Sequence, residues 1–353
     1  MIDIIIPVYN TPIEDLNRCF ESIQKQTYTK FNVYIIDDGS TKEIALYLDE
    51  YTKKNKKFKV KHKKNGGVSS ARNYGLSQCK SEYLAFVDAD DSIEKNFFEE
   101  AIKLIQKYNL DQVVGKIKVI NQNEINNQAT TDNKEFIIYE KNNLFDFMDK
   151  TISVYLNKNN FNLKDVATGR IYCKIYKRNN IDNLLFEEKL KLSEDTLFCI
   201  DSLNINSKIG VFDSYWYNYY QNEYSALHKK TTYEQIIQLE NLIDELTKRK
   251  DKIKSNKLKN SFNLRIIDNY FYIFKKMIKL QVCDKEFEKC FKKKDNIINL
   301  KKTKYNKYTN YKLNVIIFYY YLVYVPYCIK LLSFKFFKCI IKFKTGGLNR
   351  SER

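Results

Sequence analysis

Three aspartates crowd the end of an apolar run in residues 83–91, which read YLAFVDADD. The run predicts a buried strand that ends at turn-forming residues. Two carboxylates about 4 Å apart repel by about 4 kcal/mol at an effective dielectric near 20. Water, protonation of one member or a bound cation relieves that repulsion. In an extended chain Asp88 and Asp90 point the same way, which is the arrangement that a hard divalent cation needs.

A simpler interpretation concerns Asp91 alone. Asp91 and Glu94 have the spacing of a capping pair before the helical pattern NFFEEAIKLI. This interpretation leaves Asp88 and Asp90 unexplained, so the cation hypothesis stays the broader one.

The first hundred residues alternate strands with helices. Strands are predicted in DIIIPVYN, FNVYIIDDGS, KFKVKHK and YLAFVDADD, the third at a sheet edge because its lysines alternate outwards. Thr11 with Glu14, and Ser40 with Glu43, form capping boxes that open the first two helices. This alternation predicts an α/β fold with a mainly parallel sheet.

Ligands bind such sheets outside the carboxyl ends of the strands. That rule brings polar groups from three strands to one rim, in the segments PVYN, DDGS and DADD. The residues concerned are Tyr9, Asn10, Asp37, Asp38, Asp88, Asp90 and Asp91.

Beyond residue 95 the pattern is looser. Residues 121–135 are polar and predict a loop, IYCKIYKRNNI predicts a strand or hairpin, and Glu194 and Asp195 open an apolar helix. An aromatic strand follows in SYWYNYY, and a helical pattern begins at Tyr233. We therefore expect domains at 1–230 and 231–353.

Charge separates these two regions. Residues 1–230 hold 33 Lys and Arg against 32 Asp and Glu, whereas residues 231–353 hold 28 against 11. A neutral body with a basic tail indicates an enzyme tethered to an anionic partner rather than a uniformly basic nucleic-acid-binding protein. The eight cysteines include no C-x-x-C pair, and the N-terminus has no signal-peptide pattern, so a reducing, cytoplasmic location is expected.

Six motifs in order carry a resemblance to a known family. IIIPVYN, IIDDGS, SSARNYGL, FVDADD, YCKIYKR and SEDTLF resemble the family 2 glycosyltransferases of the bacterial surface-polysaccharide type, over about residues 1–228. The resemblance implies a GT-A fold, a Rossmann-like mixed sheet flanked by helices, here followed by a helical basic region. It also implies inverting transfer of a sugar from a nucleotide-diphosphate donor, most often a UDP-sugar, to a hydroxyl of a glycan or lipid-linked acceptor.

The resemblance assigns roles to the rim. Tyr9 would stack on the base, Asp38 would hydrogen-bond a uracil edge, and Asp88 would lie near the ribose. The donor-binding set is Pro7, Tyr9, Asn10, Asp38, Arg72 and Asp88. Asp90, with Asp91 and His228 as further candidates, would hold Mn²⁺ or Mg²⁺, and Asp195 in preference to Glu194 would be the catalytic base.

The chemistry agrees with these roles. A divalent cation on one or two carboxylates neutralises a departing diphosphate, and inversion by single displacement needs one base on the opposite face. Other interpretations stay open: Glu194 and Asp195 could merely favour the N-terminus of their helix. Gly66 and Gly67 could form a turn or allow close approach of a phosphate.

The tail has its own pattern. Residues 313–329 are uncharged and interrupted by Pro326, and Lys335, Lys338 and Lys342 then cluster on one helical face. Residues 313–344 thus predict an amphipathic segment that docks on the anionic inner face of the cell membrane. Helical packing or a homodimer through the C-terminal helices, and a membrane span, are the alternatives.

Two other functions compete with sugar transfer. A sugar-nucleotide pyrophosphorylase also uses an α/β fold and Mg²⁺, but PVYNTPIED lacks the glycine-rich basic loop typical of that class. A nucleic-acid-binding protein would use the basic tail, and the acidic rim argues against it. The chain lacks Q-x-x-R-W, so addition of a single sugar is expected rather than processive synthesis.

Overall fold

The structure is a computed structural model that describes residues 1–120, 135–153, 166–203, 207–221 and 232–280. The chain divides into two compact units, Met1–Lys230 with Asp244–Arg265, and Thr231–Ile243 with Ile266–Arg353. The expected domain boundary near residue 230 stays a prediction. Three predictions fall outside the described residues: they concern His228, residues 121–134 of the predicted loop, and the segment 313–344.

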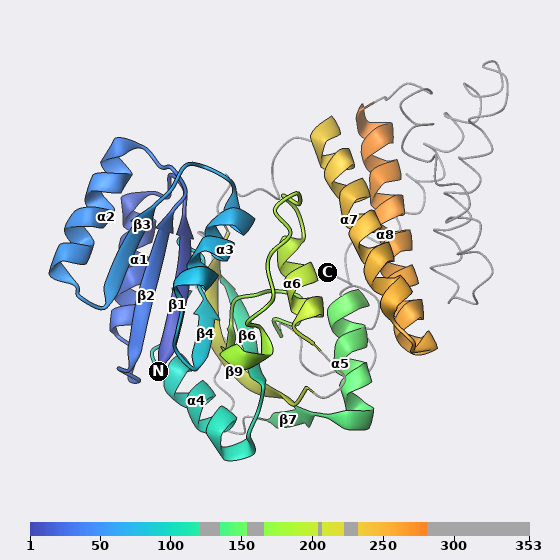
Figure 1. Cartoon of the computed structure of the whole chain (residues 1–353), viewed down its shortest axis with the longest axis horizontal. Helices are drawn as coiled ribbons and strands as arrows, with labels where there is room; N and C mark the ends of the chain where they lie inside the picture. Colours follow the sequence, from blue (N-terminus) through green and yellow to red (C-terminus); the bar gives the residue numbers. More distant parts are fainter. Residues whose placement is uncertain (121–134, 154–165, 204–206, 222–231, 281–353) are drawn as a thin grey trace. The chain divides into compact units, whose positions relative to one another are not determined.

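A mixed β-sheet forms the centre of the first unit (Figure 1). Within the described residues the strand order is β3-β2-β1-β4-β8-β6-β9-β5, and β7 pairs with β9. The first four strands of this order are parallel, whereas β8 is antiparallel to both β4 and β6. The strands are β1 Ile2–Val8, β2 Phe31–Asp37, β3 Phe58–His62, β4 Tyr83–Phe86, β5 Ser92–Ile93, β6 Gln112–Ile120, β7 Phe136–Tyr139, β8 Lys174–Lys177 and β9 Ile209–Tyr220.

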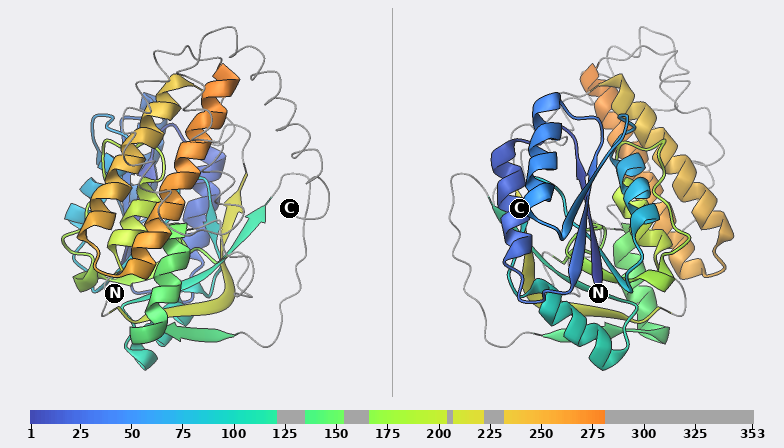
Figure 2. Two further views of the ribbon diagram at one scale, coloured as in Figure 1. Left: turned by 90° about the vertical axis from the view of Figure 1, so that its right-hand side faces the viewer. Right: turned by 60° about the vertical axis from the view of Figure 1, so that its left-hand side comes forward.

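Helices cover both faces of the parallel strands, with α1 and α2 on one face and α3 on the other (Figure 2). Helix α1 buries Leu16, Cys19, Phe20 and Ile23 at helical spacing. Helix α3 lies so close to β1 that a Cβ on Gly75 would be 2.6 Å from a methyl carbon of Ile5. The helices are α1 Ile13–Gln24, α2 Lys42–Lys54, α3 Val68–Gln78, α4 Phe97–Tyr108, α5 Lys141–Ser153, α6 Glu194–Asp201, α7 Tyr233–Lys252 and α8 Asn256–Leu280, with a 3₁₀ turn at Arg178–Asn180.

Several expectations about local structure are confirmed. Strand β3 lies at the end of the sheet, and its Lys59 and Lys61 are exposed. Glu194 begins α6, and Tyr233 begins α7. Cys19, Cys79, Cys173 and Cys199, the cysteines among the described residues, are free and buried.

The capping expectations are wrong. Helix α1 has Pro12 at its N-cap and α2 has Thr41, and neither cap side chain makes a capping hydrogen bond. The capping interpretation of Asp91 is also wrong, because β5 intervenes and Asn96 is the N-cap of α4.

The acidic segment differs from the extended chain that alternation predicts. Strand β4 ends at Phe86, and the N–H of Asp91 donates to the carbonyl of Asp88 at 3.2 Å. The aspartates therefore lie on a turn, and their side chains need not point the same way. Among the described residues no helix has the length and apolar character needed to cross a membrane.

Candidate active site

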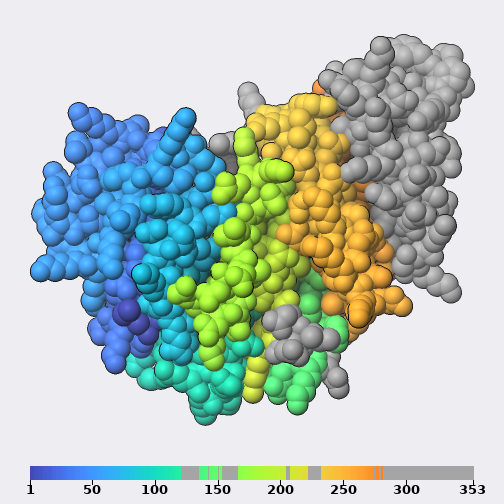
Figure 3. Space-filling model, viewed as in Figure 1, coloured from blue at the N-terminus to red at the C-terminus, as the bar shows by residue number. Residues whose placement is uncertain are grey.

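A cavity of about 900 Å³ opens at the carboxyl ends of β1, β2 and β4. Helix α3 lies beside the segment that carries α6 on this part of the molecule (Figure 3), where Asn73 donates to the carbonyl of Phe186 at 3.0 Å. The cavity lining includes eight of the residues predicted from the sequence: Pro7, Tyr9, Asn10, Asp38, Arg72, Asp88, Asp90 and Glu194. The rule for parallel sheets thus placed most of the predicted rim at the cavity, whereas Asp37 and Asp91 are buried and are not among its lining residues.

Tyr9 and Asn10 leave β1 at the mouth of this cavity. The side chain of Tyr9 is 57% exposed, so it is an available aromatic face rather than a core residue. Asn10 has a positive φ of 52°, and its side-chain oxygen accepts from the N–H of Thr41 at 2.8 Å. The N–H of Asn10 donates to the Ser40 hydroxyl at 3.0 Å. These two bonds fix the loop after β1 against the start of α2.

Asp38 organises the loop before α3. Its buried carboxylate accepts from the N–H groups of Gly66 at 3.0 Å and Gly67 at 2.7 Å, and from the Lys63 ammonium at 2.5 Å. Gly67 has a φ of 88°, a conformation that favours glycine. The glycine pair therefore forms an ordered turn held by Asp38. One carboxylate oxygen accepts a single donor, so the group keeps acceptor capacity toward the cavity.

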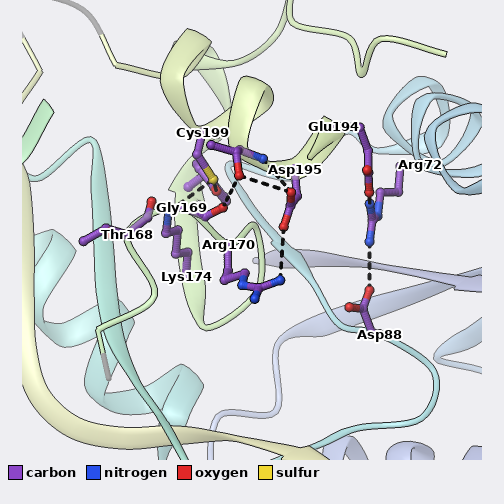
Figure 4. Close-up of polar contacts among 11 residues, drawn as sticks. Arg72, Asp88, Thr168, Gly169, Arg170, Lys174, Glu194, Asp195 and Cys199 are labelled. Carbon is purple, nitrogen blue, oxygen red and sulfur yellow. Dashed lines mark hydrogen bonds and ion pairs between the residues drawn. The ribbon is translucent and has the colours of Figure 1, made fainter. Parts of the chain in front are cut away.

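Arg72 connects two acids across the cavity (Figure 4). One of its terminal nitrogens lies 2.9 Å from Glu194 and the other lies 3.0 Å from Asp88. Burial alone would lower the pKa of Arg72, but the carboxylates of Asp88, Glu194 and Asp195 raise it, so the guanidinium stays charged. Burial and the nearby Asp195 raise the pKa of Glu194, and Arg72 acts in the opposite direction.

Contacts from two sides hold the turn of residues 88–91. From β9, the Tyr217 hydroxyl accepts from the N–H of Asp88 at 3.1 Å and donates to the Asp91 carboxylate at 2.7 Å. Burial raises the pKa of Tyr217 well above its usual value, so that the hydroxyl keeps its proton. From α1, Arg18 donates to the carbonyl of Asp90.

Asp90 and Asp91 face different surroundings. Asp90 lines the cavity, and burial together with the Asp88 carboxylate raises its pKa to about 6. Asp91 is 1% exposed and accepts from Tyr217 and from the N–H of Tyr220 at 2.9 Å. Burial and the two neighbouring aspartates raise the pKa of Asp91 to about 8. Asp91 is not among the residues that line the cavity, so its position supports the turn.

The start of α6 supplies the second pair of acids. Glu194 faces Arg72 and lines the cavity, whereas the Asp195 carboxylate lies 3.8 Å from a terminal nitrogen of Arg170 (Figure 4). The Asp195 side chain is 16% exposed and accepts from the N–H of Thr196 at 2.7 Å. Thus Glu194 pairs with Arg72, whereas Asp195 faces Arg170.

Arg170 belongs to a segment that α6 and β8 hold in place. The Thr196 hydroxyl donates to the carbonyl of Gly169 at 3.2 Å, and the buried Lys174 ammonium donates to the carbonyl of Thr168 at 2.7 Å. Lys174 also lies 3.3 Å from the sulfur of Cys199 (Figure 4). These contacts fix the backbone on both sides of the residue that accompanies Asp195.

The acidic turn fits a divalent cation that a substrate helps to bind. The described residues contain no group of three or more His, Cys, Asp or Glu that could hold a metal ion by themselves. Mg²⁺ in nucleotide sites is typically bound by one or two carboxylates together with substrate phosphates. Arg72 pairs with Asp88, but no Lys or Arg of the described residues lies within ion-pair distance of Asp90, whose pKa is raised, and such an ion would supply the missing positive charge.

Sequence reasoning missed Tyr217, Lys63, Arg170 and Lys174. Tyr217 lies in the aromatic strand that was predicted, but that strand contains several tyrosines and nothing local distinguishes this one. Lys63 is one of many lysines around β3. Lys174 lies within the motif YCKIYKR, but nothing in that motif distinguishes its role from that of Lys177, and no short motif marks Arg170.

Comparison with known proteins identifies the class. Residues 3–185 match the family described as "Glycosyl transferase family 2", which is more than half of the chain, and the chain belongs to this family. Glycosyltransferase GlyG of Streptococcus pneumoniae is 31% identical over 141 residues, covering 40% of this chain and 46% of GlyG. The uncharacterized glycosyltransferase EpsJ of Bacillus subtilis is 25% identical, covering 63% of this chain and 61% of EpsJ. The chain therefore spans less than two thirds of the length of these relatives.

Solved structures establish the fold. The crystal structure of S. aureus TarS 1-349 in complex with UDP-GlcNAc has a TM-score of 0.60 at 20% identity, covering 85% of this chain and 80% of that one. GalNAc-T7 with UDP, GalNAc and Mn²⁺ has a TM-score of 0.51 at 17% identity, covering 76% and 50%. The predicted GT-A-type fold, with a mixed sheet flanked by helices, is confirmed, and the described part of the C-terminal region, residues 232–280, is helical as expected.

Proposed function

We propose that this chain is an inverting, metal-dependent glycosyltransferase that moves a single sugar from a nucleotide-diphosphate donor, most often a UDP-sugar, to a hydroxyl. The acceptor is a glycan or a lipid-linked saccharide in the synthesis of a bacterial surface polysaccharide such as capsule or lipopolysaccharide. The observation that carries this proposal is one cavity bordered by two acid clusters that differ in charge balance. Glu194 and Asp195 each have an arginine nearby, whereas no Lys or Arg of the described residues lies within ion-pair distance of Asp90 or Asp91.

The donor would lie along the strand ends. Tyr9 would stack on the base, and the remaining acceptor capacity of Asp38 would take up the N–H of a uracil edge. The N-terminus of α3, where Gly67 and Val68 line the cavity, favours the negative charge of a diphosphate. Arg72 would keep the Asp88 carboxylate in place near the ribose.

Asp90 would hold the Mn²⁺ or Mg²⁺ ion, with Asp91 and His228 as the other candidates. Such an ion, when bound, neutralises the charge that develops on a leaving diphosphate. The structures of TarS in complex with UDP and of GalNAc-T7 with UDP and Mn²⁺ support the choice of donor and metal. The residues of the chain orient the donor and keep the acid turn rigid.

Asp195 would act as the general base. A single displacement needs one carboxylate on the face opposite the leaving group, positioned to remove the acceptor proton. Glu194 forms an ion pair with Arg72 at 2.9 Å, so one of its carboxylate oxygens is engaged in holding that guanidinium. Asp195 lies farther from its arginine, at 3.8 Å, and keeps 16% of its side chain exposed beside the cavity-lining Glu194, although Asp195 is not itself a lining residue. It is the candidate that we choose to face an incoming hydroxyl.

The experiment that tests the activity is a donor-hydrolysis screen across UDP-, GDP- and dTDP-sugars with Mn²⁺, Mg²⁺ or EDTA. We expect UDP-sugar turnover that needs the metal and that EDTA removes. Pyrophosphate-dependent exchange of the donor in place of sugar release would instead identify a pyrophosphorylase. Binding of single-stranded DNA with no donor hydrolysis would point to the nucleic-acid alternative.

The C-terminal segment would place the enzyme on the cytoplasmic face of the membrane, near a lipid-linked acceptor. Residues 313–344 carry this proposal through their amphipathic pattern, and the homodimer through C-terminal helices is its competitor. Deletion of residues 313–353 should reduce flotation with anionic liposomes. Unchanged flotation together with a change from dimer to monomer would favour the competitor.

A further inference from the structure

The charge balance of the first 230 residues conceals a dense basic surface. Residues 53–64, KKNKKFKVKHKK, contain eight lysines and one histidine and no acidic residue. Seven of the lysines are exposed: Lys53, Lys54, Lys56, Lys57, Lys59, Lys61 and Lys64. We call these seven the lysine surface. It spans the last turn of α2, the edge strand β3 and the loops on either side of that strand.

None of these seven ammonium groups is neutralised within the described part of the chain. No carboxylate there lies within ion-pair distance of any of them, although other surface lysines, such as Lys25 and Lys103, do have acidic partners. Lys57 donates to the carbonyl of Thr29, and Lys59 lies 5.2 Å from the ring centre of Tyr34, but neither contact removes the charge. The eighth lysine, Lys63, is the one that pairs with an acid, Asp38.

Local structural roles explain only part of this surface. Lys53 and Lys54 complement the negative end of α2, and Lys59 and Lys61 discourage pairing at the sheet edge. Lys56, Lys57 and Lys64 serve neither purpose, yet they extend the same positive face. Concentrating like charges on one surface costs self-repulsion, which a negatively charged partner relieves.

The composition of the surface indicates the kind of partner. It contains no arginine, so it lacks the planar fork that recognises a single phosphate in a bidentate manner. Phe58, the one Phe, Tyr or Trp of the segment 53–64, is 3% exposed and cannot stack on a nucleic-acid base. None of its lysines lines the cavity described above. Exposed, flexible point charges of this kind suit a broad anionic surface rather than a shaped ligand.

We propose that the lysine surface on β3 and the end of α2 is a docking surface for an anionic lipid bilayer. It belongs to the glycosyltransferase unit itself and does not depend on the amphipathic segment at 313–344. The inference is also independent of the sugar-transfer reaction, because no residue of the surface belongs to the proposed donor or base machinery.

The test measures binding of the full-length chain to vesicles of phosphatidylcholine alone and of phosphatidylcholine mixed with phosphatidylglycerol. The test variant changes Lys54, Lys56, Lys61 and Lys64 to Gln. The side chains of these four lysines make no hydrogen bond, ion pair or ring contact with the described residues. The control variant changes Lys80, Lys95, Lys103 and Lys107 to Gln, which removes the same charge from exposed positions before β4 and in or next to α4. A third variant changes the four test positions to Arg.

We expect the test variant to bind the phosphatidylglycerol vesicles at least tenfold more weakly, since each lysine near an anionic surface contributes about fivefold. The control variant should bind within about twofold of the wild type, and the Arg variant should bind like the wild type. Added salt should weaken wild-type binding and reduce the difference between variants.

Equal loss in the test and control variants would overturn the proposal, because net charge rather than this surface would then govern binding. Unchanged binding of the test variant would also overturn it and leave the C-terminal segment as the anchor. If the test variant keeps its affinity for vesicles but loses affinity for single-stranded DNA, the surface is a nucleic-acid site instead. UDP binding and the melting temperature of each variant establish that the fold is retained.

Discussion

Two acid clusters border the cavity, and they differ in how their charge is balanced. At the start of α6, Glu194 pairs with Arg72 and Asp195 has Arg170 nearby. In the turn after β4, Asp88 shares Arg72, but no Lys or Arg of the described residues lies within ion-pair distance of the Asp90 or Asp91 carboxylates. The pKa of Asp90 is accordingly raised to about 6 and that of Asp91 to about 8.

This difference in charge balance indicates which of the two acid clusters needs a bound cation. Carboxylates that have their own cations are complete in the protein alone, whereas crowded buried carboxylates are stable as anions only when a positive charge joins them. The turn is nevertheless held in place by hydrogen bonds from Tyr217 and from the backbone of Tyr220. A rigid, under-neutralised acid turn is what a cation-binding site requires, and the α6 pair lacks that property.

The largest expected effect comes from Asp90→Asn. Losing a metal ion that stabilises the leaving group by several kcal/mol should lower kcat by about 10³-fold or more. Calorimetry with Mn²⁺ in the presence of UDP should show that metal binding is lost as well. Asp91→Asn is the informative comparison, because equal loss of Mn²⁺ affinity would mean that Asp91 shares the ion. If Asp90→Asn binds Mn²⁺ like the wild type, the turn is not the metal site.

The next effect separates the two acids of α6. Asp195→Asn should lower transfer by about 10²–10⁴-fold, the usual contribution of a general base, while UDP binding stays near the wild-type value. Glu194→Gln should instead weaken donor binding, because Arg72 loses one of its two carboxylate partners and holds Asp88 less firmly. Measuring kcat together with the Kd for UDP distinguishes the two outcomes. The reverse pattern would make Glu194 the base.

The same two clusters show how far sequence alone reaches. The strand–helix alternation placed both clusters near strand or helix ends, because apolar periodicity and turn residues are local signals. The conformation of the acid turn could not be predicted, since it depends on Tyr217, which is 126 residues from Asp91. Pairing of β9 with β5, where Ser92 opposes Asn218, brings that tyrosine into place, and no local pattern encodes this register.

The capping errors have a related cause. Thr11 and Ser40 have the right residue types for N-caps, but Asn10 and Ser40 hydrogen-bond across two loops instead. The Ser40 hydroxyl, which a local capping motif would use, is thus engaged by the N–H of Asn10 in a tertiary contact. Arg170 and Lys174 escaped notice for the same reason, because their partners come from other elements.

A moderate effect is expected from Tyr217→Phe. The substitution removes the hydroxyl that joins the N–H of Asp88 to the carboxylate of Asp91, and leaves both buried groups short of a partner. Such losses cost about 1–3 kcal/mol, so affinity for Mn²⁺ with UDP should fall by about tenfold or more. The readout is the Kd for Mn²⁺ with UDP beside the melting temperature.

Tyr172→Phe is the matched control for that substitution. Tyr172 stacks on Tyr217 with ring centres 4.4 Å apart, and within the described residues no hydrogen bond of its hydroxyl is found. The Tyr172→Phe variant should keep its affinities for Mn²⁺ and UDP within about twofold of the wild type, since the substitution breaks no hydrogen bond. Equal losses in the two variants would show that ring packing, and not the hydroxyl bridge, fixes the acid turn.

The smallest expected effect concerns a third group of acids, Asp37 and Asp49, whose negative charge is balanced by a histidine that titrates near neutral pH. His62 lies on the edge strand, 2.7 Å from Asp37 and 3.2 Å from Asp49. Burial alone would lower the pKa of His62, but the hydrogen bonds to Asp37 and Asp49 raise it above its ordinary value of 6.5. The protonated form is therefore favoured in the folded state, so its stabilising contribution is complete below the unfolded pKa and disappears as the pH rises through the folded one.

We expect His62→Gln to lower the melting temperature slightly at pH 5.5 and to have no effect at pH 8.5, since the imidazole is 40% exposed and solvent screens the pair. Thermal melts of the two proteins over this range provide the measurement. A constant difference across the range would mean that His62 acts through packing and not through its charge. Arg72 and Arg170, the partners of Glu194 and Asp195, stay protonated over this pH range, unlike His62. Their contribution to the melting temperature should therefore not change through titration of the cation.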